Sequence, residues 1–145
     1  MIFQLDKATE FPDPRYGNED GFYAVGGEVT AEMLIKAYPM GIFPYFAFRE
    51  EPIIWWAPQK RFVIFSNEVH VSHSMRNLIN KRRYRCTVNQ AFPDVIAGCA
   101  CTDQRIEEYN AWLGPDLIDT WMDLNEEGYA KSVEVWDGDI LVGGL

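Results

Sequence analysis

The stretch that most restricts the fold is GIFPYFAFREEPIIWWAP, residues 41 to 58, which holds six aromatic residues and three prolines. Prolines interrupt regular backbone hydrogen bonding, so we expect a loop of rigid, flat side chains. Trp55 and Trp56 are adjacent on an extended piece, so their side chains should point to opposite faces. One ring can anchor the loop while the other offers a stacking surface for a base. Two interpretations remain open, a filled core and a platform for a flat ligand.

The residues on either side of this loop alternate between helical and extended patterns, which indicates an α+β fold. Residues 1–20 contain prolines and glycine, which favours an irregular surface arm. We expect helices over 31–38, 75–83, 91–100 and 115–127, strands over 61–65 and 84–89, and a hairpin over 130–145. The residue pattern changes after Pro58, from the aromatic and proline-rich loop to strand and helix patterns. We therefore expect one domain over residues 1–60 and a second over 61–145.

Several residue types mark the ends of these elements. Pro115 suits the first turn of the last helix, and Gly128 suits the position just after its end. Asp137-Gly138 is a strong signal for a two-residue hairpin turn. Side-chain oxygens at helix starts accept hydrogen bonds from unpaired amides. The expected N-caps are Thr30, Ser72 or Ser74, and Asn89.

The formal net charge of −9 would by itself argue against a nucleic-acid partner. The charge is uneven, however. Between Lys60 and Arg85 there are seven basic residues and one acidic residue, whereas the rest of the chain carries six basic and 21 acidic residues. Such a basic segment can steer a polyanion to one face. The alternative is a solvated helix with cationic residues near its C-terminus.

The cysteine and histidine content gives little support to a metal site. Three cysteines, an odd number, indicate reduced thiols in a cytoplasm. His70 and His73 are too few to complete a four-ligand site, so we expect no metal. No apolar run approaches the ~18 residues of a membrane span, and the N-terminus lacks a secretory pattern. We therefore expect a cytoplasmic protein that does not contact a membrane.

One carboxylate stands apart from the solvated acids. Glu134 lies inside the expected strand SVEVW, on the same side as Ser132 and Trp136. A carboxylate in that position is either a buried, hydrogen-bonded group or a residue of a site. The sequence leaves both readings open.

Most of the chain resembles a known bacterial family, the leucyl/phenylalanyl-tRNA–protein transferases. The resemblance is carried by GGEVTAEMLIKAYPMGIFPYF, PIIWWAPQKR, HVSHSM, YRCTVNQAFPDVIAGCA and SVEVWDGDILVGGL. The order and spacing run without large gaps from about Gly21 to Leu145. The G-I-F-P-[WY]-F and W-W-[AS]-P signatures are long and specific. The resemblance covers almost all of this chain and about the first 60% of a usual family member.

The resemblance implies an aminoacyltransferase that moves leucine or phenylalanine from aminoacyl-tRNA to proteins beginning with Arg or Lys, which are then degraded. It implies no metal and no organic cofactor, because the amino-acid ester is already activated. The implied fold is a small N-terminal domain followed by an acyl-CoA N-acyltransferase-like (GNAT) domain, here incomplete. The alternative hypothesis of a CoA-dependent acetyltransferase rests on fold analogy alone, and the chain lacks the turn that would bind a pyrophosphate.

The resemblance also implies site residues. Trp56 matches the tryptophan that stacks near the terminal adenosine of the tRNA, and Trp112 matches a second tryptophan of that pocket. Trp121 stands where the family usually has Tyr, which keeps the flat surface and loses the phenolic hydroxyl. Leu145 stands where an apolar residue lines the pocket for the transferred side chain. The expected contacts to the tRNA backbone are the basic residues Arg76, Lys81, Arg82, Arg83 and Arg85.

The family residues linked to the transfer step lie beyond the position of Leu145, so no catalytic residue is assigned in this chain. Two hypotheses follow from the sequence. The first is an active transferase, and the second is a truncated, non-catalytic remnant that binds the tRNA end. The apolar hairpin has a single expected partner strand, which predicts an open sheet and self-association through it.

Overall fold

The computed structural model describes residues 2–6, 10–45, 52–100 and 113–145, and the fold is α+β. Its first sheet has four strands: β1 (Phe3–Leu5), β2 (Phe22–Gly26), β3 (Phe43–Tyr45) and β4 (Ile54–Trp56), in the order β1-β2-β4-β3. β1 runs parallel to β2, and the other pairs are antiparallel. The expectation of a wholly irregular arm over residues 1–20 is therefore wrong, because residues 3–5 pair with β2.

Helix α1 (Ala31–Ala37) follows β2 in the chain, and its predicted N-cap, Thr30, is confirmed. The Thr30 hydroxyl oxygen accepts a hydrogen bond from the Met33 amide at 3.2 Å. The helix continues into the 3₁₀ turn η2 (Tyr38–Met40), which ends at Gly41 with φ of +72°. Glycine takes this left-handed conformation without the steric cost that a Cβ brings. The chain then enters β3 directly.

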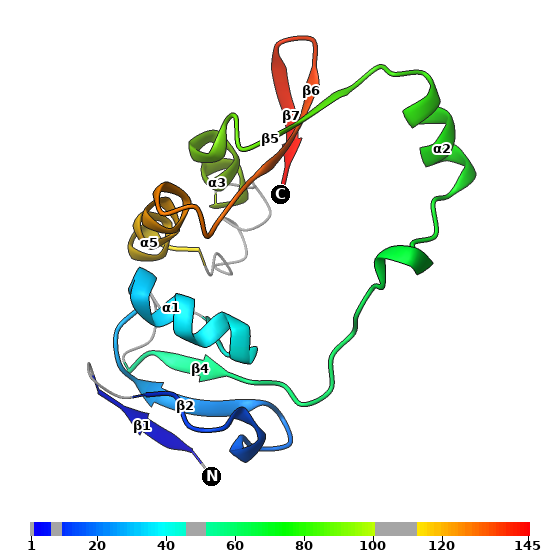
Figure 1. Ribbon diagram of the computed structural model, residues 1–145. Coiled ribbons are helices and arrows are strands. Elements are labelled where there is room, and N and C mark those ends of the chain that lie inside the picture. The colour runs from blue at the N-terminus through cyan, green and yellow to red at the C-terminus, as the bar shows by residue number, and fades with distance from the viewer. Residues whose placement is uncertain (1, 7–9, 46–51, 101–112) are drawn as a thin grey trace.

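Residues 61–84 form a long connection that stands away from the rest of the molecule (Figure 1). It holds the 3₁₀ turn η3 (Ser66–Glu68) and helix α2 (His73–Asn80), which Ser72 caps by accepting from the Met75 amide at 3.3 Å. The strand predicted over residues 61–65 is wrong, and the Phe62 side chain is 95% exposed. A strand needs a neighbour for its backbone hydrogen bonds, and neither described sheet offers one beside this segment.

The second sheet has three antiparallel strands, β5 (Arg85–Val88), β6 (Val133–Asp137) and β7 (Ile140–Gly144), in the order β5-β6-β7. The predicted hairpin is confirmed, with the two turn residues at 138 and 139 rather than 137 and 138. Helices α3 (Phe92–Ala100) and α5 (Pro115–Glu126) lie beside it, and α3 packs on β7. Pro115 opens α5, and Gly128 follows its end with φ of +84°, as predicted. Asn89 has φ of +55° and lies three residues before α3, and its side-chain oxygen accepts a hydrogen bond from the Asn125 side chain at 2.6 Å, so the expectation that it is the N-cap of α3 is wrong.

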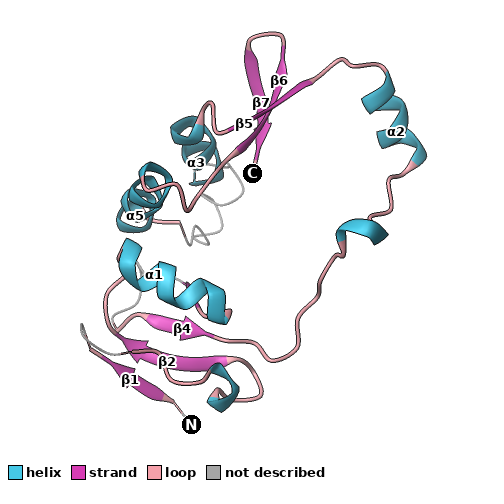
Figure 2. Ribbon diagram, viewed as in Figure 1, coloured by secondary structure: helices cyan, strands magenta, loops and turns pink. Residues whose placement is uncertain are grey.

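One hydrophobic core links the two sheets through their helices. Figure 2 shows α1 between the first sheet and α5, with α3 beyond α5. The largest buried side chains of this core are Tyr23, Trp55, Leu34, Ile42 and Leu117. The contact between α1 and α5 therefore brings residues far apart in sequence to a shared surface. No helix in the described ranges is long and apolar enough to cross a membrane.

Candidate functional site

An apolar pocket of about 220 Å³ opens where α1 and η2 meet α5. The rings of Tyr38 and Trp121 form one wall, with centroids 5.8 Å apart and planes inclined at 38°. Tilted ring pairs at this separation attract each other and hold both rings in place. The remaining lining residues are Leu34, Ile35, Pro39, Leu124, Tyr129 and Ala130. We call this the interhelical pocket.

Two residues that line this apolar pocket carry a polar group, the indole N–H of Trp121 and the hydroxyl of Tyr38. The Trp121 indole Nε1 is buried and has no hydrogen-bond partner among the described residues. A buried N–H without a partner costs free energy, so such a group is a favourable donor for a bound acceptor. Burial also raises the pKa of the Tyr38 phenol to about 12, so this hydroxyl stays neutral at physiological pH.

The two adjacent tryptophans of β4 differ in burial, as predicted. Trp55 is completely buried, packs edge-on against Phe11, and donates its indole N–H to the Gly26 carbonyl at 2.9 Å. Trp56 is half-buried and contacts Phe22, with ring centroids 5.7 Å apart. Trp55 therefore anchors β4 in the core, while Trp56 keeps part of its ring at the surface. Trp56 is not one of the residues that line the interhelical pocket.

The other expected site residues do not gather at one place in the described structure. Trp112 lies outside the described residues. Leu145 pairs through its backbone with Val133, and its side chain is 87% exposed and does not line the interhelical pocket. Of the proposed residues for the aminoacyl-adenosine end, Trp121 is the one that lines this pocket. Tyr38, which the sequence reasoning did not single out, lines it too, and its position directly before Pro39 gave no chemical signal.

The five expected tRNA-contacting basic residues lie on α2 and on the stretch that follows it. Arg83 forms an ion pair with Asp137 at 2.7 Å, and the Arg85 guanidinium lies 5.2 Å from the ring centroid of Trp136. Arg76 donates to the Val71 carbonyl at 3.1 Å. Lys81 and Arg82 are exposed at the end of α2. The cluster is thus continuous with the edge of the second sheet.

A larger groove of about 520 Å³ lies between α2 and the second sheet. The apolar face of α2 supplies Met75, Leu78 and Ile79, and the sheet supplies Val135 and Val142. All three α2 side chains are exposed. We call this surface the sheet groove.

Glu134 is a buried, fully engaged carboxylate, which resolves the alternative that the sequence left open. It accepts hydrogen bonds from the hydroxyls of Thr87 and Ser132 and from the amides of Gln90 and Ala91. Burial by itself would raise its pKa, but these hydrogen bonds outweigh burial and hold the pKa at about 2. The two amides directly precede α3, so Glu134 ties the start of that helix to β6.

Comparison with known proteins identifies the family. A sequence model described as leucyl/phenylalanyl-tRNA protein transferase matches residues 63–145, and one described as the N-terminal domain of that protein matches residues 27–59. The chain belongs to the leucyl/phenylalanyl-tRNA protein transferase family. The sequence resemblance is thereby confirmed.

Individual members of this family align along nearly the whole chain. The leucyl/phenylalanyl-tRNA–protein transferase of Flavobacterium psychrophilum is 42% identical over 141 residues, covering 97% of this chain and 66% of the relative. That of Anaeromyxobacter sp. is 40% identical over 144 residues, covering 99% of this chain and 60% of the relative. That of Edwardsiella ictaluri is 43% identical over 147 residues, covering 99% and 59%. This transferase-family chain therefore spans roughly three fifths to two thirds of the length of these relatives.

Proposed function

We propose that the interhelical pocket binds the aminoacylated 3′ end of a tRNA. The observation that carries this proposal is that Trp121, whose buried indole N–H has no partner among the described residues, lines an otherwise apolar pocket beside Tyr38. The terminal aminoacyl-adenosine offers an apolar side chain, a flat base and several hydrogen-bond acceptors. Aromatic walls suit the base, and one buried donor suits one acceptor. Membership of the transferase family supplies the ligand class.

The pocket's size fits a single ring system, so we propose that it takes the adenine base of the terminal nucleoside. Its volume of about 220 Å³ lies below the ~300–1,000 Å³ typical of sites for drug-sized ligands. Leucine and phenylalanine are apolar, and an apolar pocket distinguishes such side chains by only ~1–3 kcal/mol per methylene. We therefore expect the surface that receives the amino-acid side chain, outside the interhelical pocket, to accept both amino acids rather than one.

The proposed activity of the whole protein is transfer of leucine or phenylalanine from aminoacyl-tRNA to an N-terminal Arg or Lys of an acceptor protein in the cytoplasm, which marks that protein for degradation. The ester is already activated, so positioning of the attacking amine contributes much of the rate. We further propose that residues 1–60 and 61–145 are two domains, the second GNAT-like, that Trp56, Trp112 and Leu145 contribute to the donor site, and that no cofactor takes part.

The basic residues of α2 and β5 are proposed to contact the tRNA backbone. Arg76, Lys81 and Arg82 face solvent on or just after α2, where a phosphate can reach them. Arg83 and Arg85 are already held by Asp137 and Trp136, so they would bind with less loss of side-chain entropy. Phosphate contacts of this kind give salt-dependent affinity without reading the sequence.

Binding is tested directly by calorimetric titration of the 145-residue chain with 3′-leucylamido-adenosine, a stable mimic of the tRNA end. We expect saturable binding that Trp121→Ala removes. Trp136→Ala is a matched control, because Trp136 lies on the second sheet and does not line the interhelical pocket. Absence of binding by the unaltered chain, while a longer family member binds in parallel, would contradict the proposal.

A second candidate is binding of the tRNA end without transfer by this chain. The observation that favours it is the state of Glu134, the buried carboxylate among the described residues, whose four hydrogen bonds and low pKa make it a poor base. The test is transfer of labelled leucine from leucyl-tRNA to a peptide that begins with Arg. Transfer by the 145-residue chain would exclude this candidate.

We also propose that copies of this chain associate through the open second sheet and the connection beside it. The connection exposes the apolar run Phe62, Val63, Ile64 and Phe65, and β7 exposes Ile140 and Val142. An unpaired apolar extended segment is a template for another chain. The basic connection and the acidic remainder of a second copy also have opposite charge.

A further inference from the structure

A second, more polar pocket of about 360 Å³ lies against the interhelical pocket. Tyr38 and Pro39 line both, so these two residues form a shared wall. The second pocket is completed by residues of the N-terminal arm, of the η2 turn and of the segment after β4, namely Pro14, Arg15, Met40, Gly41, Ala57, Pro58, Gln59 and Arg61. We call it the arginine pocket. No function has been assigned to it above.

Arg61 is held in a fixed position in this pocket. Its Nε donates to the Pro58 carbonyl at 3.0 Å, and one terminal nitrogen, Nη2, donates to the Gly41 carbonyl. These two bonds leave the Nη1 donors of the guanidinium without a partner in the described part of the chain. No carboxylate in the described part of the chain forms an ion pair with Arg61, so its charge is not neutralised there.

Gly41 makes this arrangement sterically feasible. A Cβ at position 41 would lie 2.8 Å from Nη2 of Arg61, closer than real Cβ contacts, and φ there is +72°. The glycine of the GIFP stretch thus serves both the turn after η2 and the approach of the guanidinium. A residue larger than glycine would force the Arg61 guanidinium to shift from this position.

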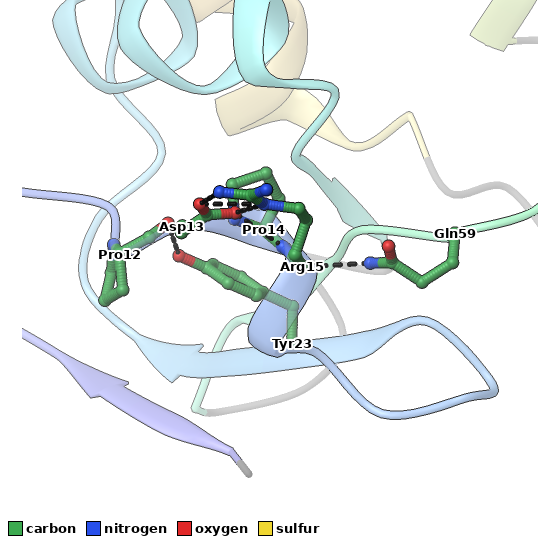
Figure 3. Close-up of polar contacts among 6 residues, drawn as sticks. All are labelled: Pro12, Asp13, Pro14, Arg15, Tyr23 and Gln59. Atoms are coloured by element: carbon green, nitrogen blue, oxygen red, sulfur yellow. Dashed lines mark hydrogen bonds and ion pairs between the residues drawn. The ribbon is translucent and has the colours of Figure 1, made fainter.

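Arg15 also lines the pocket and is held by its own partner. Figure 3 shows its guanidinium against the Asp13 carboxylate, with the closest contact at 2.5 Å, and Gln59 donating to the Pro14 carbonyl at 2.8 Å. The hydrogen bonds from Arg15 hold the pKa of Asp13 at about 2, so the pair stays ionised. Arg15 therefore supplies donors with little net charge, whereas Arg61 supplies an uncompensated positive charge.

We infer that the arginine pocket binds the phosphate on the 5′ side of the terminal nucleoside, with Arg61 as its principal ligand. The inference rests on the proposed function, because it takes the nucleoside to lie in the interhelical pocket. In an RNA chain the 5′ phosphate is the next group along from the terminal ribose, so its site must adjoin the nucleoside site. A preorganised guanidinium matches phosphate geometry, and its binding loses little side-chain entropy.

The test compares two ligands that differ by this one phosphate. The first is 3′-leucylamido-adenosine, and the second is the same compound carrying a 5′-phosphate. We expect the 145-residue chain to bind the phosphorylated compound about tenfold more tightly, as for one charge-assisted contact at a partly exposed site. We expect Arg61→Gln to abolish that difference while leaving the affinity for the unphosphorylated compound unchanged.

Three variants make the result specific. Lys60→Gln removes one positive charge from the residue next to Arg61, and the Lys60 side chain does not line the pocket. This variant should retain the tenfold preference. Arg61→Lys keeps the charge without the planar fork and should retain part of the preference. Gly41→Ala should lose it by displacing the guanidinium.

The outcomes separate this inference from the proposed function. If neither compound binds, the proposed nucleoside site is wrong and the inference falls with it. If both compounds bind the unaltered chain equally, the nucleoside site stands and the phosphate site is refuted. An equal loss of preference in Lys60→Gln and Arg61→Gln would also refute it, since that would indicate general attraction rather than a built site.

Discussion

The Thr87 hydroxyl lies 2.5 Å from Oε2 of Glu134 and donates a hydrogen bond to it across the β5–β6 pair. The same hydroxyl oxygen accepts a hydrogen bond from the Trp136 indole at 2.7 Å. The Trp136 ring in turn lies beneath the Arg85 guanidinium. A buried carboxylate thus orients, through one hydroxyl, the ring that holds a residue of the basic cluster.

We predict that Glu134→Gln lowers the melting temperature and flattens its dependence on acid pH. The folded-state pKa of Glu134, about 2, lies below its ordinary value of 4.5. Its ionisation therefore stabilises the fold fully above about pH 4.5, and this contribution is lost as the pH falls towards 2. A neutral amide also presents donors to the Gln90 and Ala91 amides. Thermal unfolding followed by circular dichroism at several pH values between 2 and 7 measures both effects.

The control for this prediction is Glu68→Gln, which changes the same functional group on the exposed η3 turn. It should leave the melting temperature within experimental error of the unaltered chain. Identical pH profiles for Glu134→Gln and the unaltered chain would show that the Glu134 hydrogen bonds do not contribute to stability.

We predict that Trp121→Phe and Trp121→Ala separate two roles of the indole. Phe keeps an aromatic wall next to Tyr38 but lacks the N–H, so it should weaken binding of 3′-leucylamido-adenosine by about 0.5–1.5 kcal/mol, the worth of one neutral hydrogen bond. Ala removes the wall as well and should abolish measurable binding. Calorimetric titration of the three proteins provides the affinities. Equal affinities for Phe and Trp at this position would mean that the buried N–H does not contact the ligand.

We predict that Trp56→Ala also weakens binding of this mimic, by about 1–3 kcal/mol, the worth of its partly exposed ring stacked on the base. Trp56 contacts Phe22 rather than the residues of the interhelical pocket. The measurement therefore decides whether the donor site extends from α5 to β4. Phe22→Ala serves as a control for local loss of packing, and unchanged affinity in Trp56→Ala would restrict the site to the interhelical pocket.

We predict that the chain self-associates with increasing concentration and that Phe62→Ser with Ile64→Ser reverses this. Both side chains are exposed on the connection before α2, and their removal deletes apolar surface without touching the core. Static light scattering over a broad concentration range measures the mass. Tyr16→Ser, which replaces an exposed aromatic residue on η1, should not change it. A monomer at every concentration in the unaltered chain would refute the proposed association.

Local sequence predicted those features whose cause is local. Thr30 and Ser72 cap their helices because the accepting oxygen and the donating amide are three residues apart. Gly128 and the hairpin near Asp137 follow equally from short-range backbone requirements. The strand expected over residues 61–65 failed for the opposite reason, since β propensity becomes a strand through a neighbouring strand, and none in the described residues lies beside it.

The sequence by itself determined the family, the α+β character, the helix ends and the basic segment, because each is written in motifs or spacings along the chain. Tertiary structure alone decided that Trp121 meets Tyr38 across α1 and α5, and that Arg61 meets Gly41 beside the same wall. These pairs are 83 and 20 residues apart in the chain. Their approach depends on the packing of the shared core, which no local pattern encodes.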